Sequence, residues 1–293
     1  MSMMTAQREP SRQSAPAVES RSPFVRLTEL IAGITPGKPA INLSVGEPQH
    51  AVPDFVGPEL AAHIADFGRY PPNKGIEPFR KAVADWLGRR YMLPRSVDPE
   101  TEVLVLNGTR EGLFLAAISA RRYVGQRTGQ PAILIPNPFY AAYAAGALAA
   151  DCEPVFLPAR REGGFLPDLD ALDDALLART VACYIASPSN PQGAVADRAY
   201  LDRLATLSRR YGFLVFADEC YCEIYSEHKP AGMLEAAGRP RIAVACADDL
   251  VGDVELLGVE PPVLLDVFFV AIGGDRDILR RHRHLRRCDV PQF

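Results

Sequence analysis

Short apolar runs alternate with longer amphipathic stretches along most of the chain. The runs are rich in β-branched and aromatic residues, which favours strands, whereas the helical period of the stretches between them favours helices. The predicted strands are Glu102–Leu106, Ala132–Ile135, Glu153–Leu157, Val181–Ala186, Phe213–Ala217, Arg241–Cys246 and Val267–Ala271. The predicted helices are Glu77–Tyr91, Glu111–Arg122, Phe139–Ala149, Leu169–Ala178 and Arg198–Tyr211. Strands that are apolar on both faces and separated by helices predict an α/β fold, with a mostly parallel sheet covered by helices on both sides.

Composition and charge fit a globular protein with one large domain and a smaller appendage. The chain has 293 residues, and its hydrophobic content of 48% is enough to form a large core. A formal net charge of -4 gives no indication of a nucleic-acid or membrane partner. The cysteines lack the paired spacing of metal sites, which predicts reduced thiols in a cytoplasmic protein and no bound metal.

We expect no targeting or membrane signal at either end of the chain. Residues 1–23 are rich in Ser, Arg, Gln and Pro and lack the apolar core of a signal peptide, which predicts a disordered leader. The run Val263–Ile272 contains Asp266 and is too short to cross a bilayer. The basic cluster Arg280–Arg287 is interpreted as the solvated face of a helix rather than as a nucleic-acid patch.

Two loops that follow predicted strands carry candidate ligand-binding groups. Asn107–Glu111 opens a helix, so its free backbone N–H groups and the positive end of the helix dipole could face a phosphate. A plain turn with a helix N-cap is the alternative interpretation. Tyr140, at the end of Pro136–Tyr140, could lie flat on a planar ring or pack on the helix that it begins.

Two further strand ends add a hydrogen-bond donor and an acid. Asn190 stands between two prolines in Ser187–Gly193, where its amide could donate to a ring oxygen, although such turns also occur without a ligand. Asp218 and Tyr221 follow the apolar run Phe213–Ala217, so a carboxylate and a phenol could lie side by side at the carboxyl edge of the sheet. The four strand ends together describe a pocket for pyridoxal 5′-phosphate, in which Asp218 would keep the pyridine nitrogen protonated.

The order and spacing of six motifs resemble the class I/II aminotransferases, which are pyridoxal phosphate enzymes of fold type I. The resemblance runs from about Leu43 to Tyr225. Its motifs are Gly46-Glu47-Pro48, Tyr70 with Gly75, Asn107–Glu111, Pro136–Tyr140, Ser187–Gly193 and Asp218–Tyr221. The fold that the resemblance implies is a mostly parallel seven-stranded sheet sandwiched by helices, with an incomplete small domain.

The resemblance also implies a role for each matching residue. The phosphate would be bound by Gly108, Thr109 and Arg110, the ring would stack on Tyr140, its oxygen would meet Asn190 and Tyr221, and its nitrogen would pair with Asp218. Tyr70 resembles a tyrosine that reaches the phosphate of a neighbouring subunit, and Gly46 resembles a glycine whose backbone meets the substrate carboxylate. A homodimer with shared sites is therefore implied.

The same resemblance suggests domain limits and a substrate class. Residues 24–45 would be the N-terminal segment of the small domain, 46–275 the large cofactor-binding domain, and 276–293 the start of a truncated C-terminal part. The details Gly46–Ala51, Tyr70–Asn73 and Asn137–Tyr140 are most similar to succinyldiaminopimelate aminotransferases of lysine biosynthesis. The implied reaction moves an amino group between such an amino acid and the 2-oxo acid 2-oxoglutarate.

One group that the chemistry requires does not match. In this family the Schiff-base lysine lies on a Ser-x-Ser-Lys loop after the aspartate. The only lysines of this chain are Lys38, Lys74, Lys81 and Lys229, and none fits that motif. Phe269–Ala271 again resembles a strand of this family. Counting back from that strand places the expected lysine near Gly258. The segment 247–266 is atypical throughout.

Three functions stay open on this sequence. The first is an aminotransferase whose turnover in this chain is doubtful because the catalytic lysine is absent. The second is a catalytically inactive remnant or pseudoenzyme that keeps the fold. The third is a pyridoxal phosphate-dependent carbon–sulfur lyase or decarboxylase, since one pocket of this kind serves several chemistries.

Overall fold

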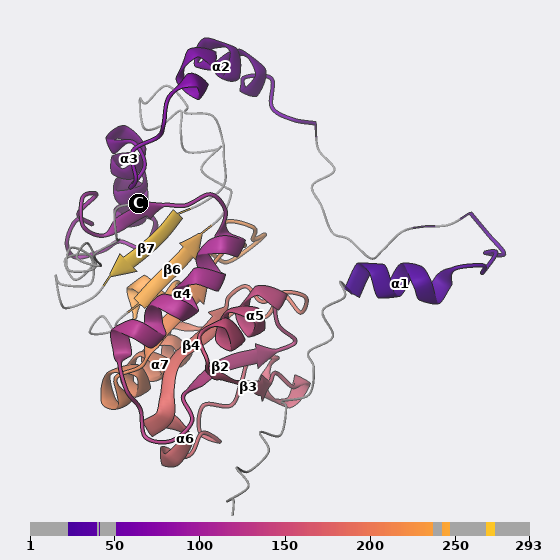
Figure 1. Cartoon of the computed structure of the whole chain (residues 1–293), viewed down its shortest axis with the longest axis vertical. Coiled ribbons are helices and arrows are strands. Elements are labelled where there is room, and N and C mark those ends of the chain that lie inside the picture. The colour runs from indigo at the N-terminus through magenta and orange to yellow at the C-terminus, as the bar shows by residue number, and fades with distance from the viewer. Residues whose placement is uncertain (1–22, 40, 42–50, 237–241, 247–267, 273–293) are drawn as a thin grey trace, which may run out of the picture. The chain divides into compact units, whose positions relative to one another are not determined.

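The computed structural model describes residues 23–39, 41, 51–236, 242–246 and 268–272 (Figure 1). The chain divides into two units, Met1–Pro53 and Asp54–Phe293. The first unit contains helix α1, Pro23–Ile31, in which the Thr28 hydroxyl donates to the Phe24 carbonyl oxygen at 2.9 Å. Predictions for the leader, for Gly46, for 247–266 and for Arg280–Arg287 lie outside the described residues.

The second unit is built on one seven-stranded sheet of order β1-β7-β6-β5-β4-β2-β3. Only β7 runs antiparallel to its neighbours, so the mostly parallel sheet predicted from sequence is confirmed. The strands are β1 Val103–Val105, β2 Ala132–Asn137, β3 Glu153–Pro158, β4 Thr180–Ala186, β5 Leu214–Asp218, β6 Ile242–Cys246 and β7 Phe268–Ile272. Each of the seven predicted strands is therefore present within a few residues of its expected limits.

The helices of this unit are α2 Val56–Ala62, η1 Ile64–Gly68, α3 Glu77–Arg90, α4 Thr109–Val124, α5 Ala141–Ala149, η2 Arg161–Gly163, α6 Asp174–Arg179, α7 Arg198–Tyr211 and η3 Met233–Glu235. The predicted helices α3, α4, α5 and α7 begin and end within two residues of their expected limits, whereas α2, η1, η2 and η3 were not predicted. The prediction for α6 was too long, because the Asp173 carboxylate caps the Leu176 N–H at 2.7 Å and so fixes a later start. Among the described residues, no helix is both long and apolar enough to cross a membrane.

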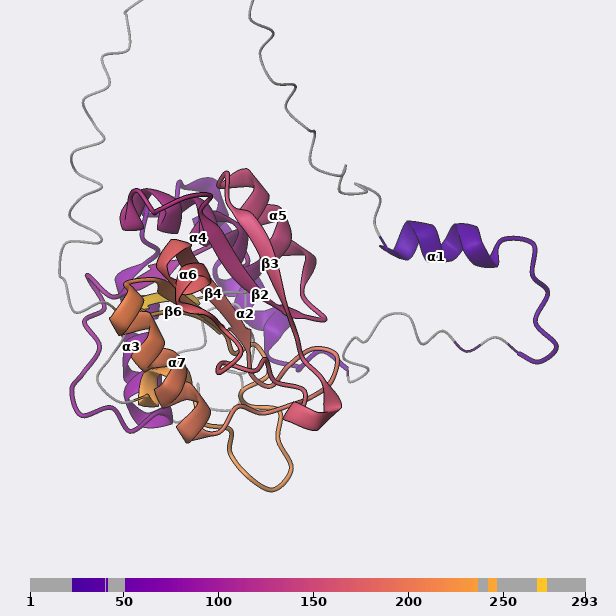
Figure 2. The same cartoon turned by 90° about the horizontal axis from the view of Figure 1, so that it is seen from below.

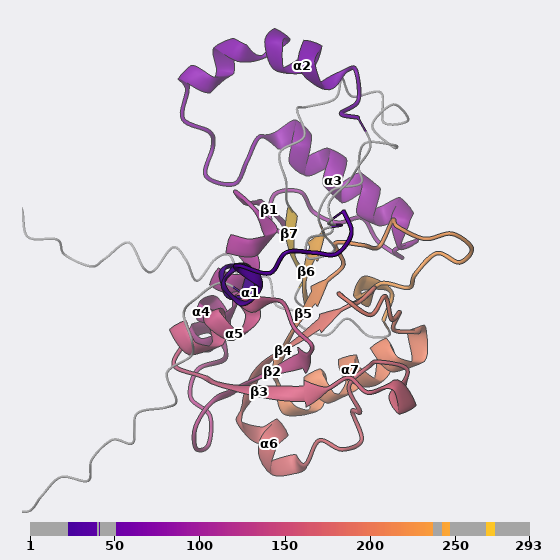
Figure 3. The same ribbon diagram turned by 90° about the vertical axis from the view of Figure 1, so that its right-hand side faces the viewer.

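Neighbouring residues of the central strands point to opposite faces of the sheet. Cys183 and Val215 belong to a buried cluster with α3, α6 and α7, whereas Tyr184 and Phe216 belong to a second cluster with α4 and α5. Figures 2 and 3 show α4 and α5 on one side of the sheet and α3 and α7 on the other. Both faces are thus covered, which explains why these strands read as continuous apolar runs.

Candidate functional site

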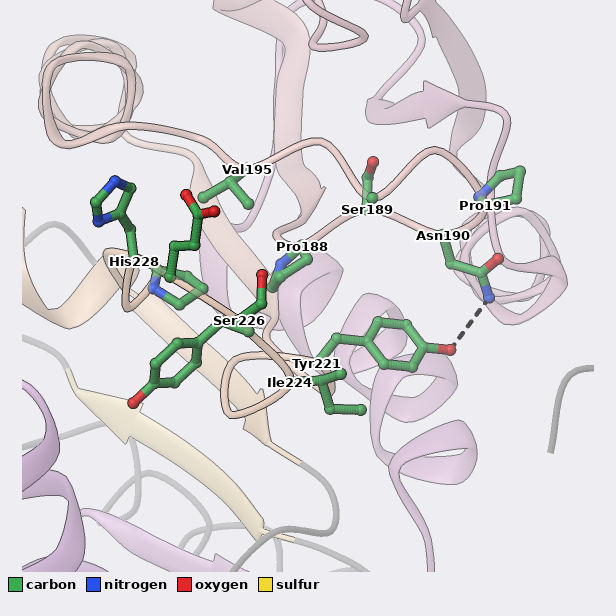
Figure 4. Close-up of a pocket in the computed structure, with 13 residues that line it drawn as sticks. Pro188, Ser189, Asn190, Pro191, Val195, Tyr221, Ile224, Ser226 and His228 are labelled. Carbon is green, nitrogen blue, oxygen red and sulfur yellow. Dashed lines mark hydrogen bonds between the residues drawn. The ribbon is translucent and has the colours of Figure 1, made fainter. Parts of the chain in front are cut away.

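The carboxyl ends of β4 and β5 meet side by side at one edge of the sheet. Ala186 pairs with Asp218 in the strand register, and the Ser187 N–H donates to the Asp218 carbonyl oxygen at 3.0 Å. Beyond these ends, the Asn190 Nδ2 donates to the Tyr221 hydroxyl oxygen at 3.3 Å (Figure 4). Residues 28 or more positions apart in sequence are therefore brought together where an open α/β sheet binds its ligands.

The Asp218 carboxylate lies at the centre of this edge and accepts two hydrogen bonds. One comes from the Tyr143 hydroxyl on α5, and the other from the Cys220 N–H at 3.3 Å. Burial, followed by the charge and hydrogen bond of Asp218, raises the pKa of Tyr143 well above its usual value of 10. Tyr143 consequently stays a neutral phenol that donates to Asp218 and holds the carboxylate in place.

Tyr143 is a site residue that the sequence reasoning missed. Its ring stacks on Tyr184 with centroids 4.4 Å apart and an interplanar angle of 11°. A signal was available, because Tyr143 lies one helical turn after Tyr140 on the apolar side of the predicted helix. Packing alone would explain a buried tyrosine there, so its contact with Asp218 could not be read from the pattern.

A substitution at Tyr143 tests how strongly the carboxylate is held. We expect Tyr143→Phe to lower the free energy of unfolding by about 1.5–3 kcal/mol, the range for a hydrogen bond to a charged group. The matched control is Tyr184→Phe, which removes a neutral bond from the stacked partner to the Leu113 carbonyl oxygen and should cost about 0.5–1.5 kcal/mol. Urea unfolding at pH 7 measures both, and equal losses would contradict the charged bond.

Arg110 and Tyr140 meet across the start of two helices. The Arg110 Nε donates to the Tyr140 hydroxyl at 2.7 Å, and the guanidinium carbon is 5.8 Å from the centre of the ring. The hydrogen bond to Tyr140 is the main cause that raises the pKa of Arg110 above its usual value. Tyr140 also packs edge to face on Tyr143, with centroids 5.9 Å apart, which links this pair to the Asp218 edge.

Gly108 gives α4 an N-terminus without a capping side chain. Its φ of 149° and ψ of 140° favour glycine, and an added Cβ would lie 2.5 Å from the Glu111 Oε2. The N-cap residue therefore offers no side-chain acceptor to the first-turn N–H groups of α4. These donors and the helix dipole form the kind of end that binds phosphate groups in proteins.

The pKa of the Tyr221 hydroxyl depends on several other candidate site residues. Burial is the main cause that raises its pKa above 10, and the charges of Cys220, Asp218 and Tyr140 add to it, while the hydrogen bond from Asn190 lowers it. Tyr221 is therefore a neutral phenol at pH 7. Because Asp218 and Tyr140 both act on this one hydroxyl, three of the predicted site residues share one neighbourhood.

The predicted roles of Tyr70 and Gly46 are not tested by the described structure, and two lysines of the chain lie outside the site. Tyr70 is fully exposed, at 102% of its reference area, between η1 and α3. Gly46 lies outside the described residues. Lys74 is used elsewhere, since its ammonium group donates to the Glu100 carbonyl oxygen at 2.7 Å. Lys229 is exposed in the loop after β5 and does not line the groove that this loop forms.

An open groove of about 460 Å³ adjoins the Asn190–Tyr221 pair. One wall is the loop after β4, from Pro188 to Val195, and the other is the loop after β5, from Tyr221 to Pro230. Figure 4 shows Asn190 and Tyr221 at one end of the groove and Ser226 with His228 toward the other. The predicted ring-oxygen ligands thus lie at the mouth of a concave surface rather than on a flat one.

Comparison with known proteins agrees with this geometry. The family model for aminotransferase class I and II matches residues 38–250. The chain belongs to the class I and II aminotransferase family. The resemblance predicted from six motifs is thereby confirmed, and the family match ends just inside the atypical segment 247–266.

Curated members of the aminotransferase family include relatives that match most of this chain. The LL-diaminopimelate aminotransferase of Desulforudis audaxviator is 34% identical over 225 residues, which cover 75% of this chain and 55% of that protein. The enzyme of the same name from Moorella thermoacetica is also 34% identical over 225 residues, or 56% of its length. The chain therefore spans little more than half the length of these relatives.

Solved aminotransferase structures share the fold. An aminotransferase from Neisseria meningitidis superposes with a TM-score of 0.74 at 32% identity, over 91% of this chain and 66% of that chain. An aminotransferase from Helicobacter pylori gives the same TM-score at 28% identity and covers 67% of that chain. The fold-type I architecture predicted from the sequence is confirmed by these matches.

Proposed function

We propose that this chain is the cofactor-binding part of a pyridoxal phosphate-dependent aminotransferase. The observation that carries the proposal is the Asp218 carboxylate, which Tyr143 holds at the same sheet edge as the bonded pair of Asn190 and Tyr221. An acid, a donor and a phenol in this arrangement match the polar atoms of a pyridine ring with an adjacent oxygen. The aminotransferase family uses this cofactor.

The described residues fit the non-covalent part of such a site. Asp218 would hold a proton on the ring nitrogen, because an adjacent negative charge favours the protonated form. Asn190 and Tyr221 would bind the ring oxygen, and Tyr140 would cover a ring face. The α4 N-terminus with Arg110 would bind the phosphate. A bound phosphate would replace the Tyr140 hydroxyl as the partner of the Arg110 guanidinium group. The Arg110 charge would then be paired with the charge of the phosphate.

The cofactor, when bound, supplies an electron sink that stabilises negative charge at the α-carbon of an amino acid. Asp218 supports that role by keeping positive charge at the ring nitrogen. The step that this chain does not supply is proton transfer at the α-carbon, since no lysine occurs where the family places it. This favours a second candidate, a chain that binds the cofactor but does not turn over.

The substrate class follows from the relatives. Relatives named LL-diaminopimelate aminotransferases support a diamino dicarboxylic acid as amino donor and a 2-oxo acid as acceptor. The motif details favour an N-succinyl derivative of the same carbon skeleton. We infer a homodimer for the whole enzyme, and the outward position of Tyr70 is suited to contact a second subunit.

Pyridoxamine 5′-phosphate tests the cofactor proposal directly, because its amine needs no lysine partner. We expect calorimetric titration of the full chain to show saturable binding of this compound and much weaker binding of pyridoxamine. The phosphate should account for the difference through the α4 N-terminus and Arg110. If neither compound binds, the cofactor proposal is contradicted. If both compounds bind with the same affinity, the phosphate site is contradicted.

A further inference from the structure

The end of α3 binds the loop after β5 at two separate points. Arg90 is the last residue of α3, and its side chain is 2% exposed. Its Nη2 donates to the Cys222 carbonyl oxygen at 2.9 Å and to the Pro230 carbonyl oxygen at 3.1 Å. One buried guanidinium group therefore joins the first part of the loop to its last residue.

The guanidinium group of Arg90 has little freedom to turn. Its Nε donates to the Glu223 carboxylate, and its Nη1 lies 4.0 Å from the Glu235 Oε1 on η3. Its central carbon lies 4.8 Å from the centre of the Tyr91 ring. Tyr91 is itself 3% exposed and donates its hydroxyl to the Glu219 carboxylate. Because the guanidinium group is planar, these contacts also fix the directions in which its other N–H groups donate.

Tyr221 lies directly before the first carbonyl group that the guanidinium group binds. The Tyr221 carbonyl oxygen accepts from the Ile224 N–H at 3.1 Å, and the Glu219 carbonyl oxygen accepts from the Cys222 N–H at 3.0 Å. These bonds form a compact turn around Tyr221. A contact that fixes the Cys222 carbonyl group therefore also limits where the Tyr221 side chain points, which is toward the Asn190 amide (Figure 4).

Packing of the loop itself contributes less to this arrangement. Cys222 and Pro230 are buried, whereas every residue of 224–229 between them is exposed. Ile224 is 64% exposed and Tyr225 is 45% exposed, so these apolar side chains gain little from burial. The hydrogen bonds of Arg90 are consequently a main support of the loop.

We propose that Arg90 is a positioning residue: by binding the Cys222 and Pro230 carbonyl oxygens, it keeps Tyr221 beside Asn190. That this pair binds the ring oxygen of the cofactor rests on the function proposed above. The contact between Arg90 and the loop does not, because its hydrogen bonds are independent of any ligand. Since its side chain is buried, Arg90 acts through the loop and not by touching the cofactor.

Hydrogen–deuterium exchange of the full chain at pH 7 measures how firmly the loop is held. Arg90→Lys keeps the charge, but a single ammonium group cannot reproduce the planar set of donors. Loss of one hydrogen bond to a charged group should raise local opening in peptides covering 219–225 by about 10–10²-fold. Arg89→Lys, at the exposed neighbouring position on α3, should leave the exchange unchanged.

Two results from this experiment would overturn the proposal. One is exchange in peptides covering 219–225 that is the same in Arg90→Lys as in the wild-type chain. The other is an equal rise in peptides from the central strand β4, because that would indicate a general loss of stability rather than release of the loop.

Glu223→Gln provides a second test if Arg90→Lys does not fold. It leaves Arg90 in place and replaces a charged acceptor by a neutral one, so local opening of the same peptides should rise by about fivefold. Glu227→Gln is the matched control, since it removes the same charge from an exposed position of the loop. No difference between these two variants would overturn the proposal.

Binding of pyridoxamine 5′-phosphate tests whether Arg90 acts through Tyr221. Tyr221→Phe and Arg90→Lys should each weaken binding by about 2–10-fold, the range for one hydrogen bond. The double variant should bind about as well as Tyr221→Phe alone, because the position of the ring matters less once its hydroxyl is absent. Losses that multiply in the double variant would overturn the positioning role.

The two kinds of measurement separate this proposal from the proposed function. If the loop opens in Arg90→Lys but the wild-type chain does not bind the compound, the proposed function fails while the support of the loop by Arg90 stands. If the wild-type chain binds the compound and Arg90→Lys binds it equally well, the positioning role fails while the proposed function stands.

Discussion

The purified chain is expected to transfer amino groups between glutamate and a 2-oxo acid at no more than a trace rate. A positioned group that moves the α-carbon proton contributes about 10²–10⁴-fold to such a reaction. The chain has no lysine in the family's position, Lys74 is bound to Glu100, and Lys229 is exposed outside the site. A coupled assay for 2-oxoglutarate consumption in the presence of excess cofactor measures the rate.

The control for this assay is a chain in which 247–266 is replaced by the corresponding Ser-x-Ser-Lys loop of an LL-diaminopimelate aminotransferase. If that replacement restores the missing group, its rate should exceed that of the unaltered chain. A robust rate from the unaltered chain would contradict the account, because the proton would then move without the lysine. Release of ammonia or carbon dioxide from an amino acid would instead favour the lyase or decarboxylase alternative.

Asp218→Asn is expected to weaken binding of pyridoxamine 5′-phosphate by about 10–10³-fold, since a carboxylate in contact with a protonated ring nitrogen shifts its pKa by about 1–3 units. Asparagine still accepts from the Tyr143 hydroxyl, so the edge of the sheet keeps a hydrogen-bond partner at this position. Isothermal titration of both chains at pH 7 gives the ratio.

A matched control for this variant is Asp85→Asn, on the exposed side of α3. It removes the same charge from the chain without touching the site, so its affinity should equal that of the wild-type chain. Equal affinity for the wild-type chain and Asp218→Asn would show that position 218 does not face the ring nitrogen. A loss that is the same for both variants would assign the effect to net charge.

The fold was predictable because its strands are apolar on both faces. Tyr184 and Cys183 point in opposite directions and are both buried, so β4 reads as one continuous apolar run with clear limits. The exact limits of a helix can depend on a capping hydrogen bond, which the pattern of apolar residues does not show. The start of α6 depends on a cap from Asp173, which a helical period extending back to Leu169 conceals.

The candidate site was predictable only as far as the strand ends define it. Asp218 ends β5 and Asn190 follows β4, and the register of these two strands places their ends at one edge of the sheet. Tyr143 was not predicted as functional, because its partner Asp218 lies on a strand 75 positions away in the sequence. A buried tyrosine becomes informative only when Asp218 is seen beside it.

A crystal structure of the chain with pyridoxamine 5′-phosphate tests the central claim most directly. The account predicts the ring nitrogen within hydrogen-bond distance of the Asp218 carboxylate, the ring oxygen at Asn190 and Tyr221, and the phosphate at the N-terminus of α4. A compound bound elsewhere, or a ring whose nitrogen faces away from Asp218, would contradict it.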